Sequence, residues 1–273
     1  PPPPPAKKKK REPRTDQEYS DFISSKELGW GNITAQEWMM NVCPEVIEHF
    51  NKFPVFAENH VYKGTPVPLQ TTDFAVRTVC TFKVVQMFAA SINAQIYLHA
   101  GSHLGAVLHG QPIPWDDDAD AFMDFNKRDE FLAICKEGYE VYPGVTAICS
   151  KQHNALKVWL QVEGMVKETK AKKAWWSPYV DLFLYKKENE HMYEVKPTGK
   201  LAEQFYTFEE YFPTVPYYFG GIIVFGPQPT LAENRYNFDL CVTAKFNHRI
   251  DTILKWPGGW TPFIDCDDLK KKF

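Results

Sequence analysis

The segment 119–125, which reads ADAFMDF, constrains the fold most because apolar and acidic residues alternate along it. Side chains two apart on a β-strand share one face, so the segment predicts a strand with one apolar face and one face that is acidic near its start. Asp118 and Asp120 share this acidic face, and Asp116 and Asp117 lie just before them. Carboxylates held this close repel one another, so the pattern indicates a cation beside the strand.

The hydrophobic spacing predicts helices and strands on both sides of this segment. The predicted helices are one after a capping box at Thr34 and Glu37 that runs through Phe50, one capped by Asp73 that runs to about Asn93, a short one over 104–108 and one over 128–135. The predicted strands are 95–99, 155–162, 179–185 and 192–195. The lysine-rich stretch 163–174 predicts a loop, 205–229 an irregular but packed segment, and 237–254 a final helix.

The chain is predicted to have three parts. Residues 1–18 begin with proline and lysine and have little to bury, so they predict a disordered linker or stem. The basic run 7–11 fits a solvated tail, with a nuclear signal or a membrane-surface patch as alternatives. Residues 19–72 predict an N-terminal helical or irregular segment, and 73–273 the main domain.

Composition and charge limit the class of protein. A hydrophobic share of 44% is enough for a sizeable core. The net charge of −3 argues against a nucleic-acid partner, which usually selects a strong basic excess. No apolar run reaches the ~18 residues of a membrane span. The chain opens with Pro1, which leaves room for a membrane anchor outside it.

The cysteines and one sequon bear on the compartment. None of the six cysteines forms a C-x-x-C pair, so their spacing argues against a zinc site. Disulfides and buried thiols both remain open for them. The sequon Asn32-Ile33-Thr34 fits a secretory lumen, although such triplets also arise by chance.

Two further features complete a candidate site. Gly101 and Ser102 follow a predicted strand and precede a short helix, where backbone N–H groups favour phosphate. Asp181 stands alone among apolar residues in YVDLFLY. Burial of a carboxylate in such a position costs free energy unless it is paired or metal-bound. Asp118, Asp120 and Asp181 together suit Mg²⁺ or Mn²⁺, which prefer hard oxygen ligands. Taken alone, Asp118 and Asp120 could be a chance D-x-D pair, and Gly101 and Ser102 could be a simple turn.

The stretch GSHLGAVLHGQPIPWDDDADAFM resembles the signature of the LicD family, which includes bacterial phosphocholine transferases and the animal fukutin and fukutin-related proteins. The family pattern is G-[ST]-x-L-G-A-x-R-H followed by I-P-W-D-x-D-x-D. The matching residues are Gly101, Ser102, Leu104, Gly105, Ala106, His109, Ile113, Pro114, Trp115, Asp116, Asp118 and Asp120. WWSPYVDLFLY and FPTVPYYFGG resemble later family segments, so the resemblance extends over about 74–247.

The resemblance implies an α+β fold of the polymerase-β-like nucleotidyltransferase type, a mixed sheet flanked by helices, with a C-terminal mixed extension. It also implies Mg²⁺- or Mn²⁺-dependent transfer of a phospho-alcohol or phospho-sugar from a nucleotide donor, of CDP type, to a hydroxyl of a glycan or glycoprotein. The acceptor hydroxyl would attack phosphorus in line, and the nucleotide monophosphate would leave. A Golgi-lumen location follows from the family, while a cytoplasmic enzyme stays open.

The resemblance also assigns roles. The predicted catalytic residues and metal ligands are Asp118, Asp120 and Asp181, the last as third carboxylate, ligand of a second metal ion or general base. The predicted donor-phosphate residues are Gly101, Ser102 and His109, with a satisfied structural histidine as the alternative for His109. Asp116 and Asp117 are predicted to bind the metal or to support its ligands.

This chain departs from the family pattern at Leu108, where the family usually has arginine. His248 and Arg249 are candidates for the missing cation. Lys157 is predicted to be a solvated lysine, with neutralisation of phosphate as the alternative. Two other functions remain open: a D-x-D nucleotide-sugar glycosyltransferase, and a LicD-like domain that binds without catalysis, which the loss of the arginine would favour.

Overall fold

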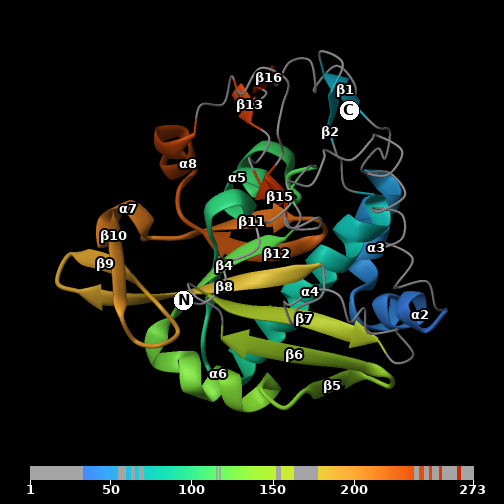
Figure 1. Ribbon diagram of the computed structural model, residues 1–273, viewed down its shortest axis with the longest axis horizontal. Coiled ribbons are helices and arrows are strands. Elements are labelled where there is room, and N and C mark those ends of the chain that lie inside the picture. The colour runs from blue at the N-terminus through green and yellow to red at the C-terminus, as the bar shows by residue number, and fades with distance from the viewer. Residues whose placement is uncertain are drawn as a thin grey trace, which may run out of the picture.

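The computed structural model describes residues 33–54, 60–62, 65–67, 71–114, 116, 118–151, 155–162, 178–236, 240–242, 246–247, 252–253 and 263–265. A ten-stranded mixed sheet with helices packed around it dominates these residues (Figure 1). The predicted α+β class with a mixed sheet flanked by helices is therefore confirmed.

The strand order places the acidic strand near the centre of the sheet. In sheet order the strands are β11 (Val215–Phe219), β12 (Ile222–Gly226), β3 (Ile96–Leu98), β4 (Ala119–Asp124), β8 (Tyr179–Glu188), β7 (Leu156–Val162), β6 (Val145–Lys151) and β5 (Tyr139–Tyr142). β9 (His191–Val195) pairs with β8, and β10 (Leu201–Thr207) pairs with β9. The pairs β12–β3 and β4–β8 are parallel, and the other pairs of the sheet are antiparallel.

The helices are short except for one. They are α2 (Ile33–Val42), α3 (Pro44–Lys52), α4 (Thr72–Ser91), α5 (Ala100–His109), α6 (Arg128–Cys135), α7 (Phe208–Tyr211) and α8 (Pro229–Arg235), with a 3₁₀ turn at Phe125–Lys127. Small two-stranded pairs are formed by β1 (His60–Tyr62) with β2 (Thr65–Val67), β13 (Leu240–Val242) with β16 (Phe263–Asp265), and β14 (Phe246–Asn247) with β15 (Thr252–Ile253). No helix of the described residues is long and apolar enough to cross a membrane.

The two faces of the sheet have different cores. Helix α4 packs on one face against β4, β7 and β8 (Figure 1). Small and aliphatic side chains of these strands point to that face, such as Ala121, Val158 and Leu182. On the other face, Phe122 packs with Tyr206 and Tyr211 in an aromatic cluster. Because neighbours along a strand point to opposite faces, Asp120 lies on the aromatic face.

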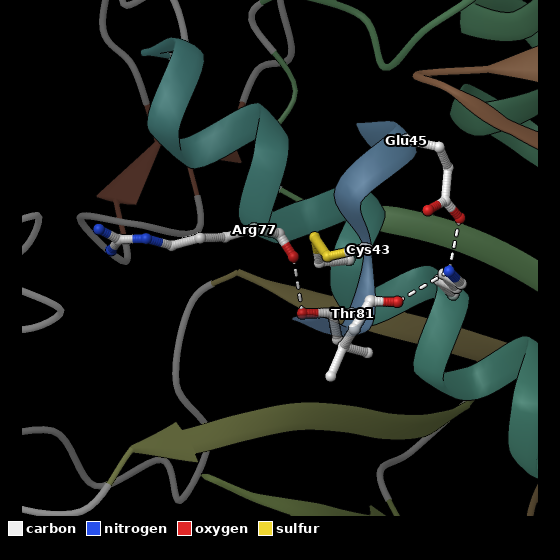
Figure 2. Close-up of a disulfide and its surroundings, with 7 residues drawn as sticks. Cys43, Glu45, Arg77 and Thr81 are labelled. Atoms are coloured by element: carbon white, nitrogen blue, oxygen red, sulfur yellow. Dashed lines mark hydrogen bonds and ion pairs between the residues drawn. A yellow bond between two sulfur atoms is a disulfide. The ribbon is translucent and has the colours of Figure 1, made fainter. Parts of the chain in front are cut away.

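The N-terminal helices are tied to α4. A disulfide joins Cys43, between α2 and α3, to Cys80 on α4 (Figure 2). Beside it, Lys83 of α4 donates hydrogen bonds to the Val42 carbonyl oxygen at 2.8 Å and to Glu45 Oε1 at 2.5 Å. This link crosses the predicted domain boundary at residues 72 and 73, while the predicted domain limits themselves remain predictions.

Several predicted element boundaries are wrong. The helix predicted through Phe50 is two helices, because Pro44 cannot continue the hydrogen bonding of α2. Thr71, and not Asp73, caps α4 by accepting a hydrogen bond from the Phe74 N–H at 3.1 Å. Asp73 instead forms an ion pair with Arg77 one turn later.

The C-terminal predictions also need correction. The segment 205–229, predicted as irregular, contains the whole of β11 and β12 as a regular hairpin with a tight turn at Gly220 and Gly221. Within 237–254, predicted as a helix, the described residues form strands β13, β14 and β15. Strand pairing with residues distant in the chain overrides the local helical spacing there.

Candidate metal centre

Three carboxylates meet at one place on the aromatic face of the sheet. Each of Asp118, Asp120 and Asp181 offers an oxygen, and these three oxygens lie within 4.8 Å of one another. Asp120 on β4 is the direct partner of Asp181 on the parallel strand β8. The sequence predicted that Asp118 and Asp120 lie close to Asp181. The register of β4 against β8 brings these carboxylates together.

A lysine extends this row by one strand. Lys157 on β7 is the direct partner of Asp181 across the antiparallel β7–β8 pair. Its Nζ lies 2.7 Å from Asp181 Oδ1 and 2.8 Å from Oδ2, and 3.6 Å from the centre of the Tyr179 ring. Lys157 is buried, so the prediction of a solvated lysine is wrong.

Helix α5 begins at the opposite side of the cluster. The helix starts at Ala100, not at residue 104 as predicted, so Gly101 and Ser102 lie in its first turn. The Gly101 N–H donates a hydrogen bond to Asp120 Oδ2 at 3.1 Å. Ala100 has a φ of 39°, a conformation that L residues rarely adopt, which makes the turn from β3 into α5 abrupt.

Glycine is required at position 101 by close packing. A Cβ atom there would lie 2.7 Å from Asp116 Oδ2 and 3.3 Å from Asp120 Oδ2. Any side chain at 101 would therefore displace the carboxylates. The structure brings Asp116 to the cluster in this way, whereas Asp117 and Trp115 lie outside the described residues.

Ser102 and His109 take different places. Ser102 is buried, and its Oγ accepts a hydrogen bond from the Asp120 N–H at 2.8 Å, so it fixes the backbone of β4 against α5. His109 stands in the last turn of α5, about 12 Å from Gly101 along the helix axis. The structure does not bring His109 to the carboxylates, and the donor-phosphate roles of both residues remain predictions.

The electrostatics of the cluster are unfavourable without a metal ion. Burial raises the pKa of Asp120 well above its usual value, and the negative charges of Asp116 and Asp181 raise it further. The Gly101 N–H and the charge of Lys157 act in the opposite direction but do not reverse the shift. A divalent cation would remove the mutual repulsion and favour the ionised carboxylates.

Arg235 at the end of α8 and Tyr236 directly after it interact with residues around the site, and the sequence analysis missed both. The Arg235 guanidinium lies 4.0 Å from the centre of the Tyr206 ring. Burial raises the pKa of Tyr236, and the charges of Asp120 and Asp116 raise it further. No motif in the sequence indicates either residue, because the packing of α8 against α5 brings them to the site. His248 and Arg249, the predicted replacement cations, lie outside the described residues.

Two buried histidines support the floor of the site. His99 precedes α5 and stacks on Phe122 with ring centres 4.4 Å apart. Burial, and then the charge of Arg235, lower the pKa of His99 to about 3. His103 Nε2 lies 3.1 Å from the Pro227 carbonyl oxygen and 3.2 Å from the Tyr217 hydroxyl, and burial lowers its pKa to about 4. Both rings are therefore neutral at physiological pH.

The comparison with known families agrees with this geometry. The family model of the LicD/FKTN/FKRP nucleotidyltransferase domain matches residues 93–229, half of the 273-residue chain. The chain belongs to the LicD/FKTN/FKRP family. The family indicates a transferase with a phosphotransferase-like role in glycan modification. No curated protein sequence matches the chain.

The matched region explains which parts of the site follow the family. It begins just before β3 and ends at the start of α8, so it contains the three carboxylates, Gly101 and Lys157. Arg235 and Tyr236 lie beyond it. The donor set of three carboxylates suits Mg²⁺ or Mn²⁺, which prefer hard oxygen ligands, and it does not suit a soft thiophilic metal.

Proposed function

We propose that this chain transfers a phospho-alcohol or phospho-sugar from a CDP-type nucleotide donor to a hydroxyl of a glycan or glycoprotein, on a polymerase-β-like nucleotidyltransferase fold. The observation that carries the proposal is the register of β4 against β8, which sets Asp120 opposite Asp181 in a family whose model spans this sheet. A nucleotide phosphate group is the substrate that such a carboxylate cluster binds through a metal ion.

Asp118, Asp120 and Asp181 would hold Mg²⁺ or Mn²⁺, with Asp116 in support. When bound, the ion would neutralise charge on the donor phosphates and on the attacking and leaving oxygens. The first turn of α5 would face the donor, because its N–H groups and helix dipole favour an anion. Its Gly101 amide already donates to Asp120.

As the alternative to binding the metal ion, Asp181 is the proposed general base for the acceptor hydroxyl. It stands at the edge of the carboxylate group and is held by Lys157, which orients its oxygens. A base must lie within hydrogen-bond reach of the hydroxyl that attacks phosphorus in line. Asp118 and Asp120 would meanwhile keep the donor in place.

The leucine at position 108, where the family usually has arginine, does not leave the carboxylates without a cation nearby. It lies in the last turn of α5, about 10 Å from Gly101 along the helix axis. Lys157 supplies positive charge at the cluster itself. The loss of the family arginine is therefore weak support for a domain that binds without catalysis.

A secretory, Golgi-lumen location is part of the proposal. Cys43–Cys80 and Cys135–Cys149 form disulfides, so for these four cysteines the buried-thiol alternative is wrong. Disulfides persist in oxidising compartments and are rare in the cytosol. A glycan acceptor is also found mainly along the secretory route.

The first test is metal-dependent nucleotide binding measured by calorimetry. We expect CDP to bind in the presence of Mn²⁺ or Mg²⁺, and binding to be lost in the double variant Asp118→Asn/Asp120→Asn. A donor series from CDP-choline to CDP-ribitol, with product analysis, would then identify the transferred group. Preference for UDP or GDP would favour nucleotide-sugar chemistry, and no nucleotide binding by folded protein would favour a non-catalytic domain.

A further inference from the structure

Lys157 has surroundings that an ordinary surface lysine lacks. Its side chain is 11% exposed and its Nζ contacts both oxygens of Asp181. It lies on the same face of the sheet as Asp120 and Asp181, since the three residues are direct partners on adjacent strands. Its neighbours on β7, Leu156 and Val158, point into the opposite core. The ammonium therefore faces the carboxylate cluster from a fixed position.

The charges of the cluster show what the ammonium does there. Asp118, Asp120 and Asp181 would carry three negative charges when ionised, and Lys157 neutralises one of them. A divalent ion would neutralise the other two. Lysine and metal ion would then stand close together on the same carboxylates, where like charges repel. Binding of the metal ion would therefore weaken the hold of Asp181 on Lys157.

We propose that Lys157 is a donor-phosphate binding residue, held by Asp181 in the metal-free site and released to a phosphate oxygen when the divalent ion takes this carboxylate. This inference rests on the proposed function. The ammonium has three donors and the side chain is flexible, so it can turn from Asp181 to a phosphate oxygen. The centre of the Tyr179 ring lies 3.6 Å from Nζ and supports the ammonium where the structure holds it.

If Lys157 has this role, its removal changes the affinities for Mn²⁺ and for CDP in opposite directions. Removal of a merely structural lysine would change both affinities in the same direction. Removing the ammonium takes away a competitor for Asp181, so Mn²⁺ should bind more tightly. It also takes away a charge-assisted hydrogen bond to phosphate, so CDP should bind more weakly. If Lys157 only held the sheet together, its loss would disorder Asp181 and weaken both ligands.

The test uses the full chain and the variants Lys157→Met and Lys157→Arg. Mn²⁺ affinity is measured without nucleotide, and CDP affinity is measured with saturating Mn²⁺ at the same pH. For Lys157→Met we expect Mn²⁺ to bind at least about fivefold more tightly and CDP about tenfold or more weakly. Lys157→Arg should keep CDP within a few-fold of the parent chain. Thermal unfolding confirms that each variant is folded.

Lys151→Met is the matched control, because it removes the same charge from an exposed position at the end of β6. It should leave both affinities unchanged. Weaker Mn²⁺ binding or unchanged CDP binding in Lys157→Met would overturn the inference while leaving the proposed function in place. If Lys157→Met does not fold, loss of CDP binding in Lys157→Arg overturns the inference and its retention supports it. If the parent chain binds neither Mn²⁺ nor CDP, the proposed function fails and the inference fails with it.

Discussion

Asp120 and Asp181 are direct partners on the parallel strands β4 and β8, although 61 positions separate them in the numbering. Lys157 follows on the next strand, so that a row of two carboxylates and one ammonium crosses three strands. The Gly101 amide closes the row at its other end. Each prediction below tests one part of this arrangement or of the fold that holds it.

Gly101→Ala is expected to impair the site more than the fold. The added methyl group would lie 2.7 Å from Asp116 Oδ2, so the carboxylates must move. Alanine otherwise suits a helix better than glycine by about 1 kcal/mol, so unfolding temperature should change little. We expect CDP binding with Mn²⁺ to weaken about tenfold or more, as measured by calorimetry.

Gly105→Ala provides the contrast on the same helix. A Cβ at this position would lie 2.6 Å from the Gln111 backbone oxygen, which cannot move as freely as a side chain. The expected result is lower thermal stability. If Gly101→Ala bound CDP and Mn²⁺ like the parent chain, the close approach of Asp116 would have no functional role.

Asp120→Asn is expected to stabilise the metal-free protein at neutral pH. The pKa of Asp120 is raised in the folded state, so the stability it contributes is present at acid pH and is lost as the pH rises through the raised pKa. Removing the charge removes this loss, and each 1 kcal/mol gained raises the unfolding temperature by about 2–4 °C. Scanning calorimetry without divalent ions measures the effect.

Mn²⁺ provides the second half of this experiment. The ion should raise the unfolding temperature of the parent chain, because it binds only the folded state. It should have little effect on Asp120→Asn. A metal-free Asp120→Asn protein that is less stable than the parent chain at neutral pH would show that the carboxylate is not strained by its neighbours.

His99 should make the protein sensitive to acid. Its pKa is about 3 in the folded state against 6.5 in an exposed histidine, so the unfolded state binds a proton first as the pH falls. Stability should then fall below about pH 6.5, by up to about 1.4 kcal/mol per pH unit for this residue, and His103 adds to the slope. Urea unfolding between neutral pH and about pH 4.5 measures it.

Two substitutions isolate the proton from the packing. His99→Phe keeps an aromatic ring beside Phe122, whereas His99→Gln loses the stacking. His99→Gln should therefore be less stable than His99→Phe at all pH values. Both lack the titrating ring, so both should show a shallower loss of stability with acid. An acid slope equal to that of the parent chain in both variants would contradict the prediction.

The two disulfides should contribute unequally. Cys43–Cys80 closes a loop with a sequence separation of 37, and Cys135–Cys149 one of 14. Loop entropy alone gives about 4 and about 3 kcal/mol for the two links. We expect Cys43→Ser/Cys80→Ser to unfold at lower denaturant than Cys135→Ser/Cys149→Ser, and the reverse order would indicate that packing around α6 and β6 outweighs loop entropy.

The strands β4 and β8 and the entry into α5 could be predicted from local patterns in the chain. Alternation of acidic and apolar residues identified β4, and the lone aspartate among apolar residues identified β8, because a carboxylate in such a position needs a partner. The glycine-serine step marked the entry into α5. The motif around Asp116, Asp118 and Asp120 was specific enough to indicate the family that the comparison confirms.

The residues that complete the site could be found only from contacts between distant parts of the chain. Lys157 resembles any strand lysine until the β7–β8 register sets it opposite Asp181. Arg235 and Tyr236 are brought toward the site by the packing of α8 on α5, which leaves no local pattern. For the same reason, the hydrogen bond of Ser102 to the β4 backbone and the strands formed by the described residues of 237–254 were not predicted. Contacts between residues distant in the chain decide pairing, register and burial, and these contacts are absent from any single stretch of sequence.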